Sequence, residues 1–579
     1  MTGTAPAEAR PVTRPRAADL AFTLLVAFVV LGPILTSRGY SLRGDMVFVP
    51  EQPWKDAWLG LDGATPRFVP GDALLSLATQ VVPGDVVQKG ILLGALLLGG
   101  VGAARMVHGH PLVGRWAAVL LFLWNPWVED RLSIGQWGIV VGYACLPWVV
   151  GAAVRLRDDP RGGWAPLTAW LGVCAVLSPA SALVATGTAL GVVLARPRWS
   201  TALVTVGASL VLNLPWIVPS LLLPSGITAP EGQFAGFAAR GESALGVVPS
   251  VLSFGGIWKA SVVPEERTVA LVVALSLVPT VLGVLGWRRA RREDPATMAG
   301  LTAVAVVAVL VTLLPAVGLV EHGLEAADDF VPALGLLRDS QRFLGPAVLV
   351  LLPGVAVTVS AIAARARRGR EAVVVLAWVA AAWPVLCLPS LAWGLQGDLA
   401  PVRYPQEWEG VADVMSDGRT VVLPWTGSYR GFAWNRLQAT LDPAPRYFAG
   451  DVVIDDRHYL EGRVLASENP LLRDVELALS SGRPEEELRA LGVRQVLLEK
   501  GNGTSVDEMP EGRVVHDGPE LRLVDLGAGA AAERDAPPRG PVLAADILAA
   551  LCFLCAVVGS VAKLLYGSRN SWAQIREGF

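Results

Sequence analysis

The sequence has few cysteines and few histidines, and each shortage argues against a kind of site. All five cysteines lie in or beside apolar segments, so none is available to form a disulfide in a polar external region. The chain also has only five histidines, and His108 and His110 stand far from the stretch Asp455-Asp-Arg-His458. A histidine-based metal centre is therefore not expected. No glycine-rich phosphate loop follows a strand-like run, which argues against an ATP-driven pump.

Charge is scarce as well, and this shortage indicates the class of protein. Only 17% of the residues are charged, 53% are hydrophobic, and the mean hydropathy is +0.48. A soluble chain of 579 residues would fold into several globular domains, and this composition leaves too little polar surface to cover them. The formal net charge of −3 gives no indication of nucleic-acid binding. We therefore expect a protein that lipid covers in part.

Apolar segments long enough to cross a bilayer recur along the chain. We expect about twelve transmembrane helices, near 18–36, 88–107, 114–128, 138–154, 164–177, 180–195, 201–222, 268–287, 297–318, 343–363, 371–394 and 541–562. The third and fifth are short enough to be re-entrant or merged with a neighbour, so the count is twelve within two. The first is too long for a removable signal peptide and is expected to remain as an anchor.

Arginines occupy every second loop between these segments, all on one side of the expected membrane. They are Arg10, Arg14 and Arg16, then Arg105, Arg115, Arg155, Arg157, Arg161, Arg196 and Arg198, and those at 288–292 and 365–370. The positive-inside rule assigns this side to the cytoplasm. We therefore expect a multi-pass protein of the cytoplasmic (inner) membrane with its N-terminus inside.

The sequence divides into five parts on this basis. They are a cytoplasmic tail (1–17), a multi-span membrane domain (18–394), an extracytoplasmic α/β domain with a linker (395–540), a final transmembrane helix (541–562) and a cytoplasmic tail (563–579). The external part has strand-like runs at 420–424, 493–498 and 521–524 and a glutamate-rich helical stretch at 484–491. Its aromatic residues, Trp425 and Trp434 among them, either stack on sugar rings or belong to the domain core.

The outward loops bring acids, arginines and tryptophans close to the expected membrane surface. These are Asp45 and Trp54 in the first loop, Glu129, Asp130, Arg131 and Trp137 in the second, and Arg338 and Arg342 in the stretch Leu337-Arg-Asp-Ser-Gln-Arg-Phe343. A carboxylate beside guanidinium groups suits a site where a base removes a proton while cations hold a phosphate. For any single acid, a solvated carboxylate or an ion pair is the plainer interpretation; Glu129 has Arg131 close by in sequence.

The order of these parts resembles a family of membrane enzymes. An acidic first outward loop precedes Asn125-Pro-Trp127 with its acid-Arg-Leu continuation and Gly135-Gln-Trp137, and Leu337–Phe343 and an external domain follow. This arrangement is similar to the GT-C class of membrane glycosyltransferases. Within that class it most resembles the membrane part of the actinobacterial arabinofuranosyltransferases, which act in cell-wall biogenesis, and the related YfhO-like proteins. The fold class expected from the resemblance is a mainly α, GT-C-like bundle with one extracytoplasmic α/β domain.

The resemblance implies inverting transfer of a sugar, arabinofuranose in the family named, from a polyprenyl-phosphate donor to a cell-envelope glycan or glycolipid outside the membrane. It implies Asp45 as the general base and Glu129 and Asp130 as a second acidic position near acceptor or metal. The phosphate ligands would be Arg338, Arg342 and Arg131, and the sugar-binding rings would be Trp54, Trp137, Trp425 and Trp434.

The chain departs from the family pattern at the first loop, because no Asp-X-Asp pair surrounds Asp45. No cofactor is therefore assigned, and a divalent cation (Ca, Mg or Mn) stays open. A transporter or flippase of lipid-linked glycans is an alternative function. It would place acids and arginines deep within the spans, whereas here they gather in loops and at helix ends. A non-catalytic protein of envelope assembly is a third alternative.

Overall fold

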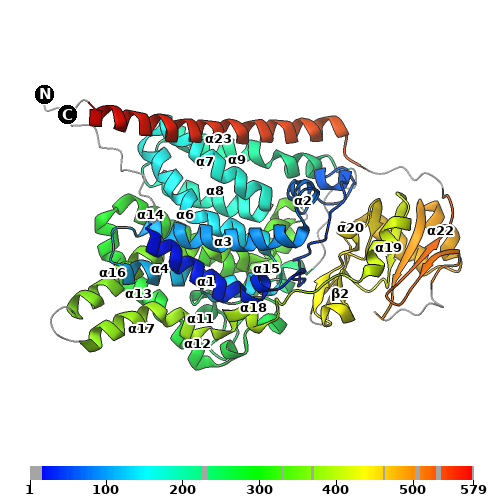
Figure 1. The fold of residues 1–579 in the computed structure, drawn as a ribbon, viewed down its shortest axis with the longest axis horizontal. Coiled ribbons are helices and arrows are strands. Elements are labelled where there is room, and N and C mark those ends of the chain that lie inside the picture. Colours follow the sequence, from blue (N-terminus) through cyan, green and yellow to red (C-terminus); the bar gives the residue numbers. More distant parts are fainter. Residues whose placement is uncertain are drawn as a thin grey trace.

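The structure is a computed structural model that describes residues 16–223, 232–328, 330–366, 371–460, 463–467, 469–501, 509–529 and 536–576. It is mainly helical, with a small α/β domain at one end (Figure 1). The long helices are α1 (Ala17–Thr36), α3 (Gly84–Met106), α4 (Leu112–Leu123), α6 (Trp137–Asp158), α7 (Pro160–Leu177), α8 (Pro179–Leu194), α9 (Trp199–Leu221), α12 (Ala270–Ser276) with α13 (Val278–Glu293), α14 (Pro295–Leu313), α16 (Val348–Ala366), α17 (Glu371–Cys387) and α23 (Arg539–Arg576).

Several helices begin with the same local device, a polar N-cap followed by proline. The pairs are Asn125-Pro126, Asp159-Pro160, Ser178-Pro179 and Asp294-Pro295, and in each the capping side chain accepts a backbone N–H of the first turn. Proline fits the first helical position because it lacks an N–H that would otherwise need a partner there. The first of these caps starts the short helix α5 (Pro126–Ser133), which carries three of the predicted site residues.

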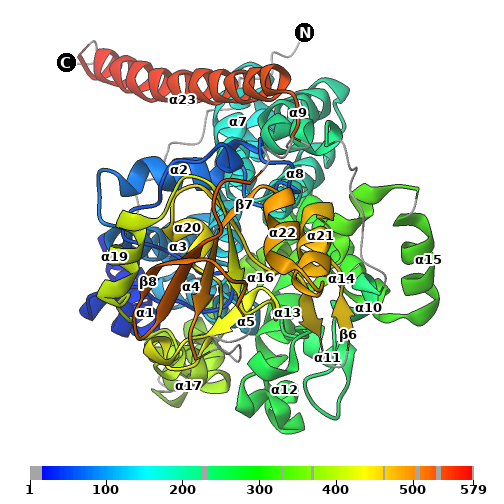
Figure 2. The same ribbon diagram turned by 90° about the vertical axis from the view of Figure 1, so that its right-hand side faces the viewer.

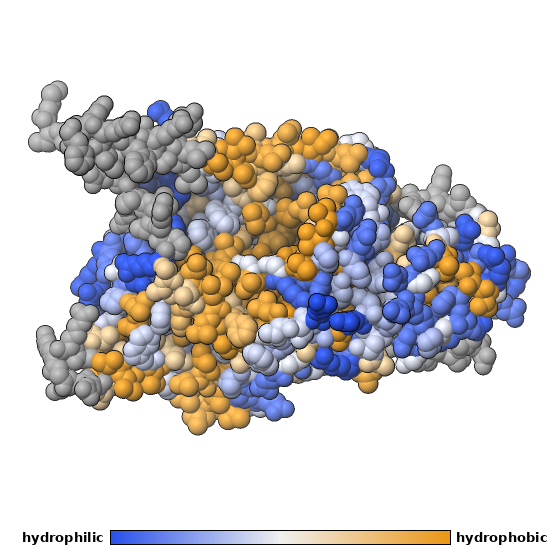
Figure 3. Space-filling view, viewed as in Figure 1, coloured by the Kyte–Doolittle hydropathy of each residue, from blue (hydrophilic) through white to orange (hydrophobic). Residues whose placement is uncertain are grey.

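Within the described ranges, eight helices are long and apolar enough to cross a membrane, or nine if the bent pair at 372–387 and 389–396 counts as one span. The expected count of twelve is not confirmed, because α4 has only 12 residues and α8 only 16. The apolar helices nonetheless make this a multi-pass membrane protein. Apolar residues cover much of the helical part, and hydrophilic ones predominate at the end that carries the α/β domain (Figure 3).

The α/β domain is built on a five-stranded sheet in the order β4-β1-β7-β9-β8. The strands are β1 (Arg419–Leu423), β4 (Asp451–Val453), β7 (Val493–Glu499), β8 (Arg513–Asp517) and β9 (Leu521–Asp525). The first three are parallel, whereas β8 and β9 are antiparallel to their neighbours. Three of the strands and the helix α22 (Pro484–Ala490) coincide with the runs expected from the sequence.

Two apolar cores, one on each face, hold this sheet between pairs of helices. Val421 and Leu423 pack on one face against α21 (Pro470–Leu479) and α22, while Val422 packs on the other face against α19 (Gln406–Val414) and α20 (Ala444–Tyr447). Figure 2 shows the two pairs on opposite sides of the sheet. This is the alternation of a strand buried on both faces.

The α/β domain is joined to the helical part by hydrogen bonds to the first loop. Tyr404 Oη donates to Phe48 O at 3.0 Å, and Asn435 Nδ2 donates to Leu42 O at 3.2 Å. The loop that follows span α1 is therefore held against this domain along much of its length.

Candidate functional site

The backbone around Asp45 is fixed between α5 and the α/β domain. The Asp45 N–H donates to Ile134 O at 2.9 Å, immediately after the end of α5. The Gly44 N–H donates to Ala439 O at 2.9 Å, in the strand β3 (Ala439–Leu441). Gly44 has φ +53°, and a Cβ there would collide with Ile134 O, so this close approach requires glycine. Asp45 therefore stands where the first loop, α5 and the α/β domain meet.

A tyrosine from the α/β domain binds the Asp45 carboxylate. Tyr429, in β2 (Tyr429–Gly431), donates its hydroxyl to Asp45 Oδ1 at 2.5 Å. The residue is 36% exposed, and protein covers the rest of its surface. This enclosure raises the pKa of Tyr429 well above 10; the Asp45 charge raises it further, while Arg67 and Arg338 act in the opposite direction. The Lys259 Nζ lies 5.8 Å from the Tyr429 ring centre. We call the set Asp45, Tyr429, Arg67, Arg338 and Lys259 the Asp45 cluster.

The cations of the Asp45 cluster come from three separate segments, and each has contacts that orient it. The Arg338 guanidinium lies 5.5 Å from the centre of the Phe237 ring. Arg67 lies 3.7 Å from an oxygen of Asp456, which follows strand β4. Burial lowers the pKa of Lys259, and the Asp45 charge opposes that change. Three cations thus lie near the Tyr429–Asp45 pair at the junction of the two parts of the protein.

A second polar group, buried around α5, contains the other predicted acids. Arg131 donates to Asp339 Oδ2 at 2.8 Å and to Gln136 Oε1 at 2.6 Å, and also to Gln341. The Gln341 Nε2 donates in turn to Asp130 Oδ2 at 3.1 Å. Arg131 and Asp339 are both fully enclosed, so the charge of this predicted phosphate ligand is matched inside the protein.

An ion pair from the segment before α12 completes this group. Arg267 Nε donates to Glu242 Oε2 at 2.7 Å, and Arg267 Nη2 donates to Ser253 Oγ at 2.9 Å. The Gly256 N–H donates to the other Glu242 oxygen at 2.8 Å. Both charged residues are buried. We call the set Glu129, Asp130, Arg131, Glu242, Arg267, Asp339 and Gln341 the α5 network.

Burial divides the acids of the α5 network into protonated and ionised groups. It raises the pKa of Glu129 to about 8, helped by the charges of Glu266 and Glu242. Burial also raises the pKa of Asp130. Burial alone would raise the pKa of Asp339 too, but its two arginine partners outweigh it and lower the pKa to about 2. Among the described residues, Glu129 Oε2 and Asp130 Oδ1 have no hydrogen-bond partner, consistent with carboxyl groups that are not fully ionised.

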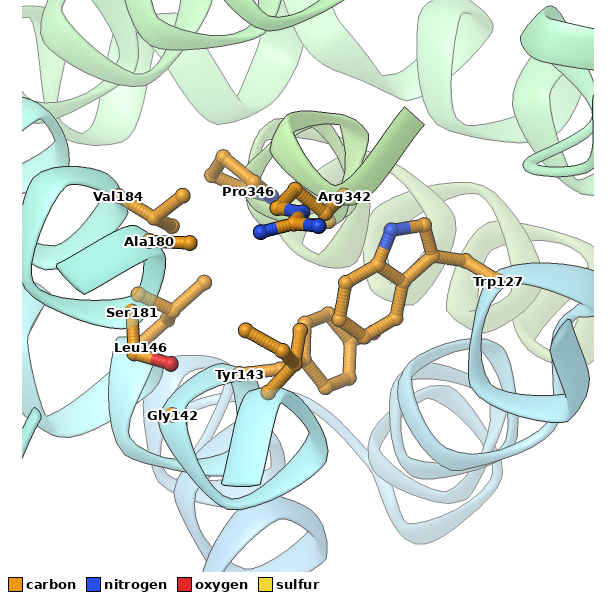
Figure 4. A pocket seen from close by; sticks show the side chains of 11 residues that line it. Trp127, Gly142, Tyr143, Leu146, Ala180, Ser181, Val184, Arg342 and Pro346 are labelled. Atoms are coloured by element: carbon orange, nitrogen blue, oxygen red, sulfur yellow. The ribbon is translucent and has the colours of Figure 1, made fainter. Parts of the chain in front are cut away.

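Arg342 reaches from this network into an apolar groove. Its Nη2 donates to Asp339 Oδ2 at 3.1 Å. The groove lies between α5, α6, α8 and η6 (Ser340–Ala347) and is narrow, with a volume of about 10 Å³ that holds about one water molecule. Figure 4 shows the guanidinium pointing into it, with the Ser181 hydroxyl across the space and Trp127 and Tyr143 beside it. A single cation in an otherwise largely apolar groove suits an anion attached to a lipid chain.

The four tryptophans named as sugar-binding rings occupy different environments. Trp54 is exposed on the first loop. Trp137 is buried and packs against two phenylalanines, with ring centres 5.2 Å apart in both pairs. Trp425 packs on the core beside α21 and α22, and Trp434 stacks on Phe432 at 4.9 Å in the other core. Three of the four rings therefore contribute to packing in this structure.

The structure thus divides the predicted site residues between two neighbouring groups. Asp45 and Arg338 belong to the Asp45 cluster, and Glu129, Asp130 and Arg131 belong to the α5 network, with Arg342 bonded to its edge. Sequence reasoning did not select Tyr429, Lys259, Arg67 or the Glu242–Arg267 pair. Tyr429 lies between Trp425 and Trp434, in a stretch rich in aromatic residues and arginines, and this composition is the one sequence signal that could have pointed to it.

No three His, Cys, Asp or Glu side chains in the described ranges are arranged to hold a metal ion. The stretch at 455–458 was considered for a metal, and in it Asp455 is bonded to Arg457 at 2.7 Å. The alternative of a Ca, Mg or Mn ion therefore gains no candidate ligand set here.

Comparison with known proteins gives a match in fold. No protein-family model matches the sequence, and no curated protein matches it. Among solved structures it is similar to the arabinofuranosyltransferase AftD from mycobacteria, with 18% identity and a TM-score of 0.55 over 89% of this chain and 40% of that one. One structure of a mutant AftD gives 18% identity and a TM-score of 0.55 over 90% of this chain and 42% of that one. A second structure of the mutant gives 16% identity and a TM-score of 0.51 over 88% of this chain and 41% of that one. The chain spans about two fifths of that enzyme's length, and over that span the two proteins are similar in fold.

Proposed function

We propose that this chain is an inverting glycosyltransferase that moves a sugar from a polyprenyl-phosphate donor to a hydroxyl of a cell-envelope glycan or glycolipid. The fold similarity favours arabinofuranose as the sugar. The observation that carries the proposal is the Asp45 cluster, in which cations from three segments lie near the bonded pair of Tyr429 and Asp45 at the end of the helical part. Base and phosphate ligands are needed together for this reaction.

In the proposed step, the Asp45 carboxylate accepts the proton of the acceptor hydroxyl. The hydroxyl oxygen then forms a bond to the anomeric carbon of the donor sugar, and the bond from that carbon to the phosphate oxygen breaks. The phosphate leaves with the electron pair, and Arg338, Arg67 and Lys259 stabilise its charge. The Tyr429 hydroxyl donates to Oδ1 of Asp45, so the acceptor hydroxyl would approach the other carboxylate oxygen while Tyr429 holds the base in place.

The α5 network has a supporting role in this proposal. Glu129 is buried with its pKa raised to about 8, so at neutral pH only a minor fraction of it is ionised. Its helix ends where Ile134 O accepts the Asp45 N–H, so the network fixes the position of the base. The Arg342 groove would have to widen by movement of the surrounding helices before it could take the first part of the lipid chain.

We further propose that the α/β domain lies outside the cytoplasmic membrane. The start of α1, the end of α23 and the facing ends of α16 and α17 lie at the end of the molecule away from that domain (Figure 1). The arginine-rich loops identified in the sequence adjoin these ends. The positive-inside rule then places the Asp45 cluster at the outer surface.

The test is transfer of a labelled sugar from a polyprenyl-phosphate donor by the purified chain in lipid nanodiscs. Asp45→Asn should reduce transfer by about 10³-fold or more, because it removes the base but keeps the shape. The matched control is Asp474→Asn, an exposed carboxylate on α21 that should change nothing. Transfer at the wild-type rate by folded Asp45→Asn would contradict the mechanism. Lipid translocation without transfer by the wild type would favour the flippase instead.

A further inference from the structure

The helix α15 (Gly318–Asp328) buries its last acidic residue against the protein, while large apolar residues at its start and just beyond its end are exposed. Asp328 is buried and accepts a hydrogen bond from Gln233 Nε2 at 2.8 Å, and Glu325 Oε1 is also enclosed. Leu319 and Phe330, by contrast, are each 86% exposed. A helix that faced water would have the opposite polarity.

The other outward positions of α15 add little polarity to this face. His322, Gly323 and Ala326 are exposed and lie one and two turns along the helix from Leu319. The His322 ring is bonded to Gly318 O at 2.6 Å, so part of its polarity is used within the helix. An imidazole is also a side chain that is accepted at a membrane interface.

This apolar face continues the lipid-facing surface of the preceding span. Val306, Val307 and Leu310 of α14 are about half exposed, and Leu314 and Val317 extend the exposed apolar surface to Leu319. The span that contains α14 has only 33% of its apolar window buried in the protein. In Figure 2, α15 stands at the rim of the helical part, away from the α/β domain helices. Lipid is the occupant that covers α14, and no break separates the two surfaces.

The inward side of α15 leads to the Asp45 cluster. Gln233, which bonds to Asp328, begins the short helix α10 (Gln233–Gly236). The next residue is Phe237, whose ring lies beneath the Arg338 guanidinium. The η5 segment (Pro332–Leu337) joins the same region directly to Arg338.

We propose that α15, together with Phe330 and Val331, inserts its outer face into the acyl-chain region of one membrane leaflet and forms the lipid-side border of the Arg338 site. The partner is the phospholipid bilayer, bound through apolar side chains at the interface. Insertion does not require transferase activity, so it can be tested independently of the proposed reaction. With the proposed function, it marks the side on which a lipid-linked donor enters.

The first experiment measures the depth of single positions in nanodiscs. Cysteine replaces Leu319 or Phe330 in a variant free of the five native cysteines, and each is labelled with bimane. Phospholipids spin-labelled on the acyl chain should quench these labels about as strongly as one at Leu310 in α14, and about threefold more than one at Leu477. Leu477 is a matched control, 68% exposed on α21 of the α/β domain. Quenching equal to that at Leu477 would overturn the proposal.

The second experiment uses the unmodified chain, in case the cysteine-free variant does not fold. A phospholipid with a photoreactive diazirine on its acyl chain is activated in the nanodisc, and the labelled peptides are identified by mass spectrometry. Labels should appear in the peptides that contain Leu319 and Phe330 as well as in α14, and be absent from α21. Labelling of α14 without labelling of α15 would overturn the proposal.

Discussion

Replacing Glu129 by glutamine is expected to make the protein more stable, which is unusual for a buried polar residue. Burial raises the pKa of Glu129 from 4.5 to about 8, so the folded protein resists ionisation of this group whereas the unfolded chain does not. The contribution of Glu129 to the free energy of unfolding is therefore fully present below pH 4.5 and is lost as the pH rises through 8. Glutamine keeps the shape and never ionises.

The magnitude follows from the pKa of the buried carboxyl. At about 1.4 kcal/mol per pH unit, holding Glu129 protonated costs about 3 kcal/mol at pH 7, and ionising it costs about 5 kcal/mol above pH 8. The residue is almost fully enclosed, so little solvent screening reduces these values. Glu129→Gln should recover most of this amount, less the hydrogen bond from Ser390 that favours the charged form.

The assay is unfolding by denaturant in detergent, followed between pH 4.5 and pH 9 for wild type and Glu129→Gln. The difference between their unfolding free energies should be near zero at pH 4.5 and should grow with pH. Glu409→Gln, at an exposed position on α19, is the control and should show no such trend. A difference that is constant with pH, or a Glu129→Gln protein that is less stable at pH 8, would refute the reasoning about the α5 network.

Three further changes test other contacts. Asp339→Asn should destabilise the protein by about 3–5 kcal/mol in the same unfolding assay, because it removes the carboxylate that pairs with the buried Arg131. The stabilisation from Asp339 is present above pH 3.8 and is lost as the pH falls through 2. Tyr429→Phe should lower kcat/KM for the acceptor about tenfold by removing one charge-assisted hydrogen bond to Asp45, and an unchanged value would separate Tyr429 from the site. Arg342→Ala should raise KM for the polyprenyl-phosphate donor about tenfold with little change in kcat, whereas an unchanged KM would remove the groove from donor binding.

The sequence predicted the class and the main segments of the protein, because membrane spans and strands have local signatures. Apolar length and arginine position depend on a few neighbouring residues, and so do the caps that begin α5 and α7. The span count was less certain, since α4 and α8 are shorter than a bilayer requires on its own. Whether short helices such as α4 and α8 cross the membrane depends on how they pack against the adjacent helices, which a local pattern does not show.

The site was predictable only in part, for a physical reason that differs between residues. Asp45 could be selected because it follows Gly44 soon after the first span, in a loop with several tryptophans and prolines. Arg131 was assigned to phosphate, whereas the structure pairs it with Asp339, 208 positions later, and no local pattern encodes that contact. Tyr429 reaches Asp45 across 384 positions through the packing of β2 against the first loop. The tryptophans were ambiguous because a core ring and a stacking ring obey the same alternation in a strand.

The most direct test of the central claim is a structure of the chain with a polyprenyl-phosphonate sugar, a donor analogue whose anomeric carbon cannot be released. The account predicts the phosphonate within hydrogen-bond reach of Arg338, and the anomeric carbon facing Asp45 across a gap of about 5 Å that admits one acceptor hydroxyl. A donor analogue bound with its sugar remote from Asp45, or on the side of the membrane where the arginine-rich loops lie, would contradict it.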